Sequence, residues 1–202
     1  MKSLNFFVLL ILLVTLIATL IPTESEAEIY TDTVRLHILA SSDTEKDQEI
    51  KLSVRDFVLE NFGTRLSGFD NIENAKLNTE KMLPEIENSV NAYLTELGVD
   101  YGARVTLGKE WYDTRDYGDF TLPRGIYCSL QILLGSCEGK NWWCVMYPPM
   151  CLDLALENAP SDDGIIDYTK EEAILITSGK YSVKFKLLEL VSDAMREISK
   201  NG

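Results

Sequence analysis

Histidine and basic residues are scarce in this sequence, and each scarcity excludes a class of function. His37 is the only histidine in 202 residues, and no Gly-x-Ser-x-Gly elbow occurs, so the residues of a histidine-dependent serine hydrolase are lacking. Lysine and arginine total 19 against 32 aspartate and glutamate residues, which gives a formal net charge of −13. A domain with this charge repels nucleic acid and anionic lipid headgroups, so we exclude nucleic-acid binding.

Motifs for metals and cofactors are also missing. The cysteines form no Cys-x-x-Cys pair, and their spacing fits no common zinc module. The stretch at residues 135–141 looks like a phosphate-binding loop, but it is one residue short and has Asn141 where the metal-binding hydroxyl belongs. We therefore expect no metal, no cofactor and no catalytic residue, so the protein is not expected to be an enzyme.

The N-terminus predicts export. No charged residue lies between Lys2 and Glu24, and residues 6–21 are apolar apart from two threonines. A cationic start followed by such a run is typical of a signal for export. The run is slightly short for a membrane span of roughly 20 residues. We expect residues 1–27 to be a signal peptide or a retained signal anchor, and residues 28–202 to form a single extracytoplasmic domain that contacts the membrane only through an uncleaved anchor.

All four cysteines lie in the second half of the chain, at Cys128, Cys137, Cys144 and Cys151. Outside the cytoplasm an even number favours disulfides over free thiols. Four cysteines allow three connectivities, so the pairing stays open. A Cys144–Cys151 bond would close a small loop with an entropic gain of about 2 kcal/mol.

Hydrophobic periodicity predicts helices early in the chain and strands later. Strands are expected at residues 33–40, 103–112, 125–134 and 142–147, with the last two joined as a hairpin through 135–141. Helices are expected at residues 44–62, 71–82, 84–97 and 181–198, with a break at 63–68 and an irregular connection at 152–163. This order predicts one α+β domain with a largely antiparallel sheet and amphipathic helices. The strand ahead of the first helix leaves α/β as the alternative.

An unusual aromatic patch occupies residues 139–151 (GKNWWCVMYPPMC). Adjacent Trp142 and Trp143 in a strand point to opposite faces, so one can join the core while the other faces outward. Pro148 and Pro149 stiffen the segment that follows and end the strand. A rigid aromatic segment suits recognition, because little conformational entropy is lost on binding; a purely structural staple is the alternative.

At this patch the sequence resembles a known family. Residues 141–151 (NWWCVMYPPMC) resemble the signature of stage II sporulation protein R (SpoIIR) of endospore-forming bacteria. Residues 34–43, 51–59 and 117–125 are similar to the family's first strand and turn, its first helix and the stretch before the tryptophan motif. Ser41 stands where the family usually has asparagine. Cys128 and Cys137 look like additions, so a second disulfide is either specific to this chain or absent.

The resemblance implies a signalling role. Members of the family are made in the forespore and exported into the space between its membrane and that of the mother cell. There they activate SpoIIGA, a membrane-embedded aspartic protease that cleaves the pro-form of sigma factor E. We therefore expect SpoIIGA to be the partner of this chain.

The candidate partner-binding residues come from the tryptophan motif and from two polar pairs, on the first predicted strand and the first predicted helix. They are Trp142, Trp143, Pro148, Pro149, Asn141, Arg35, His37, Arg55 and Asp56. Two other functions are open. One is an exported cell-wall hydrolase that uses carboxylates among Asp113, Asp116 and Asp119; the other is a passive structural protein of the intermembrane space.

Overall fold

The computed structural model describes residues 6–7, 10–11, 14, 29–117, 120–149 and 176–177. The expected export segment lies almost entirely outside the described residues, and so do the expected connection at 152–163 and the expected helix at 181–198. Within the described ranges, no helix combines the length and the apolar character needed to cross a membrane.

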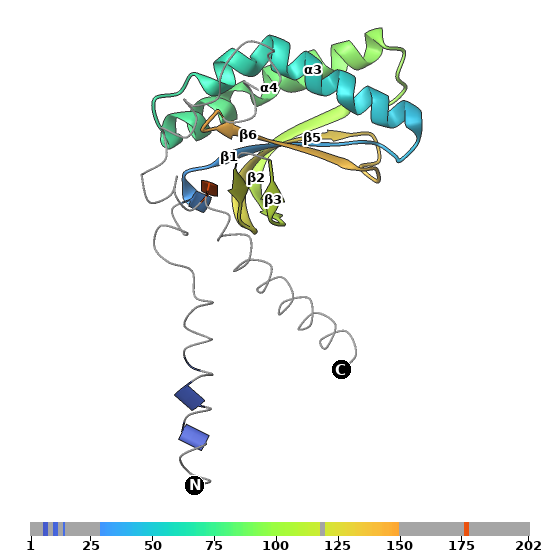
Figure 1. The fold of residues 1–202 in the computed structure, drawn as a ribbon. Coiled ribbons are helices and arrows are strands. Elements are labelled where there is room, and N and C mark those ends of the chain that lie inside the picture. The colour runs from blue at the N-terminus through green and yellow to red at the C-terminus, as the bar shows by residue number, and fades with distance from the viewer. Residues whose placement is uncertain are drawn as a thin grey trace. The chain divides into compact units, whose positions relative to one another are not determined.

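Four strands form a mixed sheet in the order β2–β5–β1–β6 (Figure 1). They are β1 (Val34–Leu39), β2 (Ala103–Tyr112), β5 (Gly125–Leu134) and β6 (Asn141–Tyr147). β1 runs parallel to β5, whereas the β1–β6 and β2–β5 pairs are antiparallel. The sheet is thus mostly antiparallel and is accompanied by two long helices, which confirms the α+β class.

The expected hairpin between the last two of these strands is wrong, because β1 lies between β5 and β6. Alternate side chains of β1, beginning at Val34, are fully buried. A buried strand satisfies the hydrogen bonds of its backbone best when a neighbouring strand lies on each side. The connection after β5 instead crosses the end of β1. There the amides of Glu138 and Gly139 donate to the carbonyls of Ser41 and Ala40, each at 3.0 Å.

The first helix, α3 (Glu45–Ser67), is longer than expected. The side chain of Thr44 caps its first turn by accepting a hydrogen bond from a backbone amide. Gly63 does not break the helix. It is buried, and the stripe of buried residues continues past it, so packing offsets its low helix propensity. The helix ends at Gly68.

The two short helices expected next are one helix, α4 (Ile72–Glu96), with Pro84 inside it. A proline in a helix interior costs about 3 kcal/mol. The buried stripe of α4 lies on both sides of the proline at helical spacing, and its packing offsets that cost; it comprises Ala75, Thr79, Met82, Ile86, Val90 and Leu94. Gly98, with φ of 68°, ends the helix as predicted.

Both helices lie on the same face of the sheet (Figure 1). α4 packs mainly against β2, and α3 reaches β6. Between them and the sheet lies the apolar core, to which β5 contributes Leu130, Ile132 and Leu134. The opposite face carries alternate residues of all four strands, many of them polar or aromatic, and the candidate site is built there and along β6.

A separate compact unit contains β3 (Arg115–Asp116) and β4 (Thr121–Leu122), which pair in antiparallel fashion. The amide of Tyr117 donates to the carbonyl of Phe120 at 2.9 Å, and the two rings stack at 4.8 Å between centroids. Of the three aspartates considered for a catalytic carboxylate pair, Asp113 and Asp116 are described, and Asp119 lies outside the described residues.

Candidate functional site

The first seven residues of the tryptophan motif (residues 141–151) form β6. The two indole rings of this strand lie on opposite faces of the sheet. Trp143 is paired with His37 of β1 and stacks on its ring at 5.5 Å between centroids. Trp142 turns toward α3, where the guanidinium carbon of Arg55 lies 5.6 Å from its ring centre. Both rings are half-buried. The alternation expected for adjacent strand residues therefore places the two tryptophans in different clusters.

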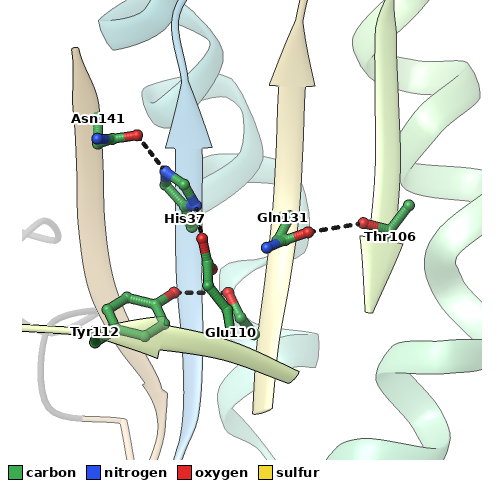
Figure 2. A network of polar contacts seen from close by, with 7 residues as sticks. His37, Thr106, Glu110, Tyr112, Gln131 and Asn141 are labelled. Carbon is green, nitrogen blue, oxygen red and sulfur yellow. Dashed lines mark hydrogen bonds and ion pairs between the residues drawn. The ribbon is translucent and has the colours of Figure 1, made fainter. Parts of the chain in front are cut away.

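His37 is the centre of the first cluster, the His37 cluster (His37, Glu110, Asn141 and Trp143). Figure 2 shows His37 between Asn141 and Glu110. Its Nε2 atom is 2.6 Å from Oδ1 of Asn141, and its Nδ1 atom is 2.8 Å from Oε1 of Glu110. The geometry of the contact with Glu110 is not that of a linear hydrogen bond, so it is a close polar contact between the imidazole and the carboxylate. These contacts tie β1 to β2 and β6.

Glu110 brings a permanent negative charge into this cluster. Burial raises the pKa of its carboxyl, but close polar contacts with His37, Gln131 and Ser129 lower that pKa to about 2. The side chain is only 19% exposed. The carboxylate is therefore ionised across the physiological range and always faces His37 as an acceptor.

Two further hydrogen bonds extend the cluster along the sheet (Figure 2). The hydroxyls of Tyr112 and Ser129 are 2.6 Å apart, and the hydroxyl of Thr106 donates to Oε1 of Gln131 at 3.2 Å. Burial raises the pKa of Tyr112, so its hydroxyl stays protonated and available as a donor. The surroundings of Glu110 are thus held by side chains from two strands.

Arg35 lies on the same face of β1 as His37 and is completely buried. Its guanidinium carbon is 3.8 Å from the ring centre of Tyr112 and 4.9 Å from that of Tyr127. A desolvated cation over aromatic faces is stabilised by about 2 kcal/mol. The sequence predicts Arg35 as a candidate contact residue; in the structure its side chain is completely buried against these rings, and direct contact with a partner stays a prediction.

Arg55, Asp56 and Trp142 form a second surface, the α3–β6 surface. Nη2 of Arg55 is 2.7 Å from Oδ1 of Asp56, and the two side chains are 28% and 55% exposed. An exposed ion pair adds little to stability. A half-exposed tryptophan beside an arginine is typical of the residues that dominate binding interfaces. This surface is accessible to a partner, as contact residues must be.

The two prolines follow β6 directly and end it, as predicted. Pro148 is buried and Pro149 is half-buried. Pro148 therefore shapes the part of the tryptophan motif that follows β6, and Pro149 has the larger accessible surface of the two.

The structure describes Cys128, Cys137 and Cys144 but not Cys151. Cys128 and Cys137 both carry free thiols, so the second disulfide is not formed between them. Cys128 lies in β5 and Cys137 lies beyond its end; the strand residues between them alone span about 20 Å, whereas a disulfide needs Cα atoms within about 7 Å. The bond between Cys144 and Cys151 stays a prediction, because Cys151 is outside the described residues.

The His37 cluster has the character of a binding or structural site. The Ser129 hydroxyl pairs with Tyr112 and not with the imidazole, whose second nitrogen faces Asn141. In the part of the chain that is described, no three metal-binding side chains gather in one place. The described side chains of the cluster bring a carboxylate, an imidazole and an indole ring together on one face of the sheet.

Sequence reasoning missed the members of this network on β2 and β5. It named His37, Asn141 and Trp143 but neither Glu110 nor Gln131. The available signal was the alternation of polar side chains along both strands. That signal becomes informative only with the register, which sets His37 beside Gln131 in the parallel β1–β5 pair.

Comparison with known proteins agrees with the resemblance seen in the sequence. A family model described as Stage II sporulation protein R matches residues 30–156. The chain is 29% identical over 167 residues to the Stage II sporulation protein R of Bacillus subtilis (strain 168), which covers 83% of this chain and 69% of that protein. No solved structure matches. The region matched by the family model contains the whole four-stranded sheet, both long helices and every candidate contact residue.

Proposed function

This chain belongs to the stage II sporulation protein R family, and we propose that it is a non-enzymatic signal that activates the membrane-embedded aspartic protease SpoIIGA. Family membership supports a role in sporulation signalling. The proposal adds export from the forespore into the intermembrane space, for which the apolar segment at residues 6–21 is the support. Cleavage of the pro-form of sigma factor E in the mother cell would follow.

The observation that carries the proposal is the placement of the tryptophan motif within the matched region. β6 holds Trp142 at an accessible position beside Arg55, with the exposed carboxylate of Asp56 next to it. Tryptophan and arginine supply most of the binding energy in many protein interfaces. We assign direct contact with the protease to this α3–β6 surface.

The His37 cluster has a different part in the proposal. His37 is 5% exposed, so it offers little surface to a partner. Its contacts with Asn141 and Trp143 hold β6 against β1. We assign it the positioning of the tryptophan motif, with Asn141 as its exposed member.

Activation requires the protein to bind the active arrangement of the protease more tightly than the inactive one. A ligand with equal affinity for both arrangements does not change the equilibrium between them. No bond is made or broken by the activator in this scheme. Loss of a contact at the α3–β6 surface should therefore reduce the amount of active protease and leave the protease's own chemistry intact.

The direct test is co-expression of the full chain with the protease and pro-sigma factor E in a host that does not sporulate. The measurement is the conversion of precursor to cleaved factor on a blot, with and without residues 1–27. We expect cleavage only with the exported chain. If both proteins are well expressed and correctly placed and no cleavage occurs, the proposal is wrong. Loss of function from Asp113→Asn or Asp116→Asn without any partner would instead indicate the exported hydrolase.

Trp142→Ala tests the α3–β6 surface in the same assay. We expect cleavage to fall by about tenfold or more, because a central interface tryptophan commonly contributes over 1.4 kcal/mol to binding. The matched control is Leu97→Ala at the end of α4, which removes another large apolar side chain that is 43% exposed. Normal cleavage with a folded, exported Trp142→Ala variant would remove this surface from the proposal.

A further inference from the structure

Among the described residues, hydrogen bonds from α4 cover only the first half of the outer edge of β2. Asn91 of α4 bonds to both the amide and the carbonyl of Ala103, at 2.8 and 3.0 Å, and Glu87 accepts from the amide of Val105 at 2.8 Å. Strand backbone groups alternate in direction, so the amides of Leu107 and Lys109 also point away from β5. Neither amide has a hydrogen-bond partner among the described residues.

A groove of about 570 Å³ lies beside this uncovered half of the edge. Its walls include side chains from three elements: Lys76 and Glu80 of α4, Leu107 and Lys109 of β2, and Ile126 and Cys128 of β5. Ile126 is 55% exposed although it lies on the helix side of the sheet. α4 therefore leaves this end of the sheet unfilled, and the groove has room for a large apolar side chain.

The shape of this groove and the exposed strand edge beside it favour an extended peptide as the ligand. Unpaired strand amides beside an apolar groove are the features that bind a peptide by strand addition. Gly108, between the two uncovered residues, has open space where a side chain would begin. Lys76 in the groove wall is paired with Glu73 at 3.8 Å, and Glu80 is also present there. Lys109 is exposed and has no ion-pair partner among the described residues, so it is the cation that a carboxylate of the bound segment would meet.

We propose that the β2 groove binds an extended segment of the protease, with an apolar side chain in the groove and a carboxylate near Lys109, as an additional strand beside β2. This inference rests on the proposed function and adds a second contact to it, at the opposite end of the strand order from β6. A second copy of this chain fits less well. Antiparallel pairing of β2 with its own copy around residues 107–109 would bring the two Lys109 side chains close together, and like charges on neighbouring strands repel.

Lys109→Pro tests the backbone contact. Proline removes the outward amide, which no strand of the described sheet uses, so the edge strand tolerates it. The matched variant is Lys109→Ala, which removes the charge and keeps the amide. In the co-expression assay with the full chain, we expect about tenfold less cleavage with Lys109→Pro and about threefold less with Lys109→Ala.

A photo-crosslinking residue in place of Lys109 supplies a measurement that does not depend on proline. Irradiation is expected to link this position to the protease and not to a second copy of the chain. Cleavage within twofold of the unmodified chain for folded, exported Lys109→Pro would overturn the inference, and so would a crosslink to a second copy alone. These results differ from failure of the proposed function, in which the unmodified chain itself gives no cleavage.

Discussion

Replacing Glu110 with glutamine tests whether its charge stabilises the fold through the His37 cluster. The substitution keeps the size of the side chain and removes the carboxylate that lies 2.8 Å from Nδ1 of His37. The pKa of Glu110 falls from its ordinary 4.5 to about 2 in the folded protein. At about 1.4 kcal/mol per pKa unit, this difference corresponds to about 3.5 kcal/mol at most. Because solvent reaches 19% of the side chain and screens part of the interaction, we expect about 1–2 kcal/mol.

The sign of the pH dependence follows from the direction of that pKa. A carboxyl whose pKa is lower in the folded than in the unfolded state stabilises the protein above the unfolded-state value and loses this contribution as the pH falls toward the folded-state value. The contribution of Glu110 is therefore complete above about pH 5 and disappears between about pH 5 and pH 2. The variant lacks the group that titrates, so its stability should change less over this interval.

Urea unfolding followed by tryptophan fluorescence at pH 7, 5, 4 and 3 measures this difference. We expect the gap in unfolding free energy between the natural protein and Glu110→Gln to be about 1–2 kcal/mol at pH 7 and to close toward pH 3. Glu60→Gln, an exposed carboxylate on α3, is the control and should show no such change. A gap that is equal at pH 7 and pH 3 would refute the electrostatic argument and leave only a packing effect.

Two further predictions concern Arg35 and Pro84. Arg35→Lys should lower the free energy of unfolding by about 1–2 kcal/mol, because an ammonium group does not stack on Tyr112 and Tyr127 as a planar guanidinium does. Urea unfolding measures this free energy, and unchanged stability would contradict the stacking role of Arg35. Pro84→Ala should raise the thermal midpoint and add about 1–2 kcal/mol to the free energy of unfolding, since Pro84 is exposed within α4 and alanine restores a helix hydrogen bond. A lower midpoint would show that the proline is needed for packing.

The strands were predictable from the sequence, and their order was not. All four strands of the sheet were expected within a residue or so of where they lie, because alternation is a local property. The hairpin between β5 and β6 was wrong, because pairing depends on where β1 inserts. Residues 125–134 and 142–147 are close in sequence and run in opposite directions, but the short connection crosses the end of β1, which lies between the two strands.

Two helix boundaries were missed for a related reason. Gly63 and Pro84 are strong local signals for a break, yet both lie inside helices. In each case buried residues continue at helical spacing on both sides. Tertiary packing of these stripes outweighs a local cost of roughly 1 kcal/mol for the glycine and about 3 kcal/mol for the proline.

The candidate site was predictable where the motif is contiguous and not where it depends on register. Asn141, Trp142 and Trp143 stand together in the sequence, and their separation onto two faces follows from strand geometry alone. Glu110 comes from a strand that is not adjacent to β1. Its contact with His37 depends on the length of its side chain and on the pairing of β2 with β5, which a single sequence does not reveal.

The register of β6 connects the two surfaces of the tryptophan motif. A slip of one residue between β6 and β1 would exchange the faces of Trp142 and Trp143, because side chains alternate along a strand. The contacts of His37 with Asn141 and Trp143 exist only in the observed register, where Trp143 is paired with His37. The His37 cluster therefore keeps Trp142 directed toward Arg55. Under the proposed function, a buried histidine would in this way affect binding at the α3–β6 surface without touching the partner.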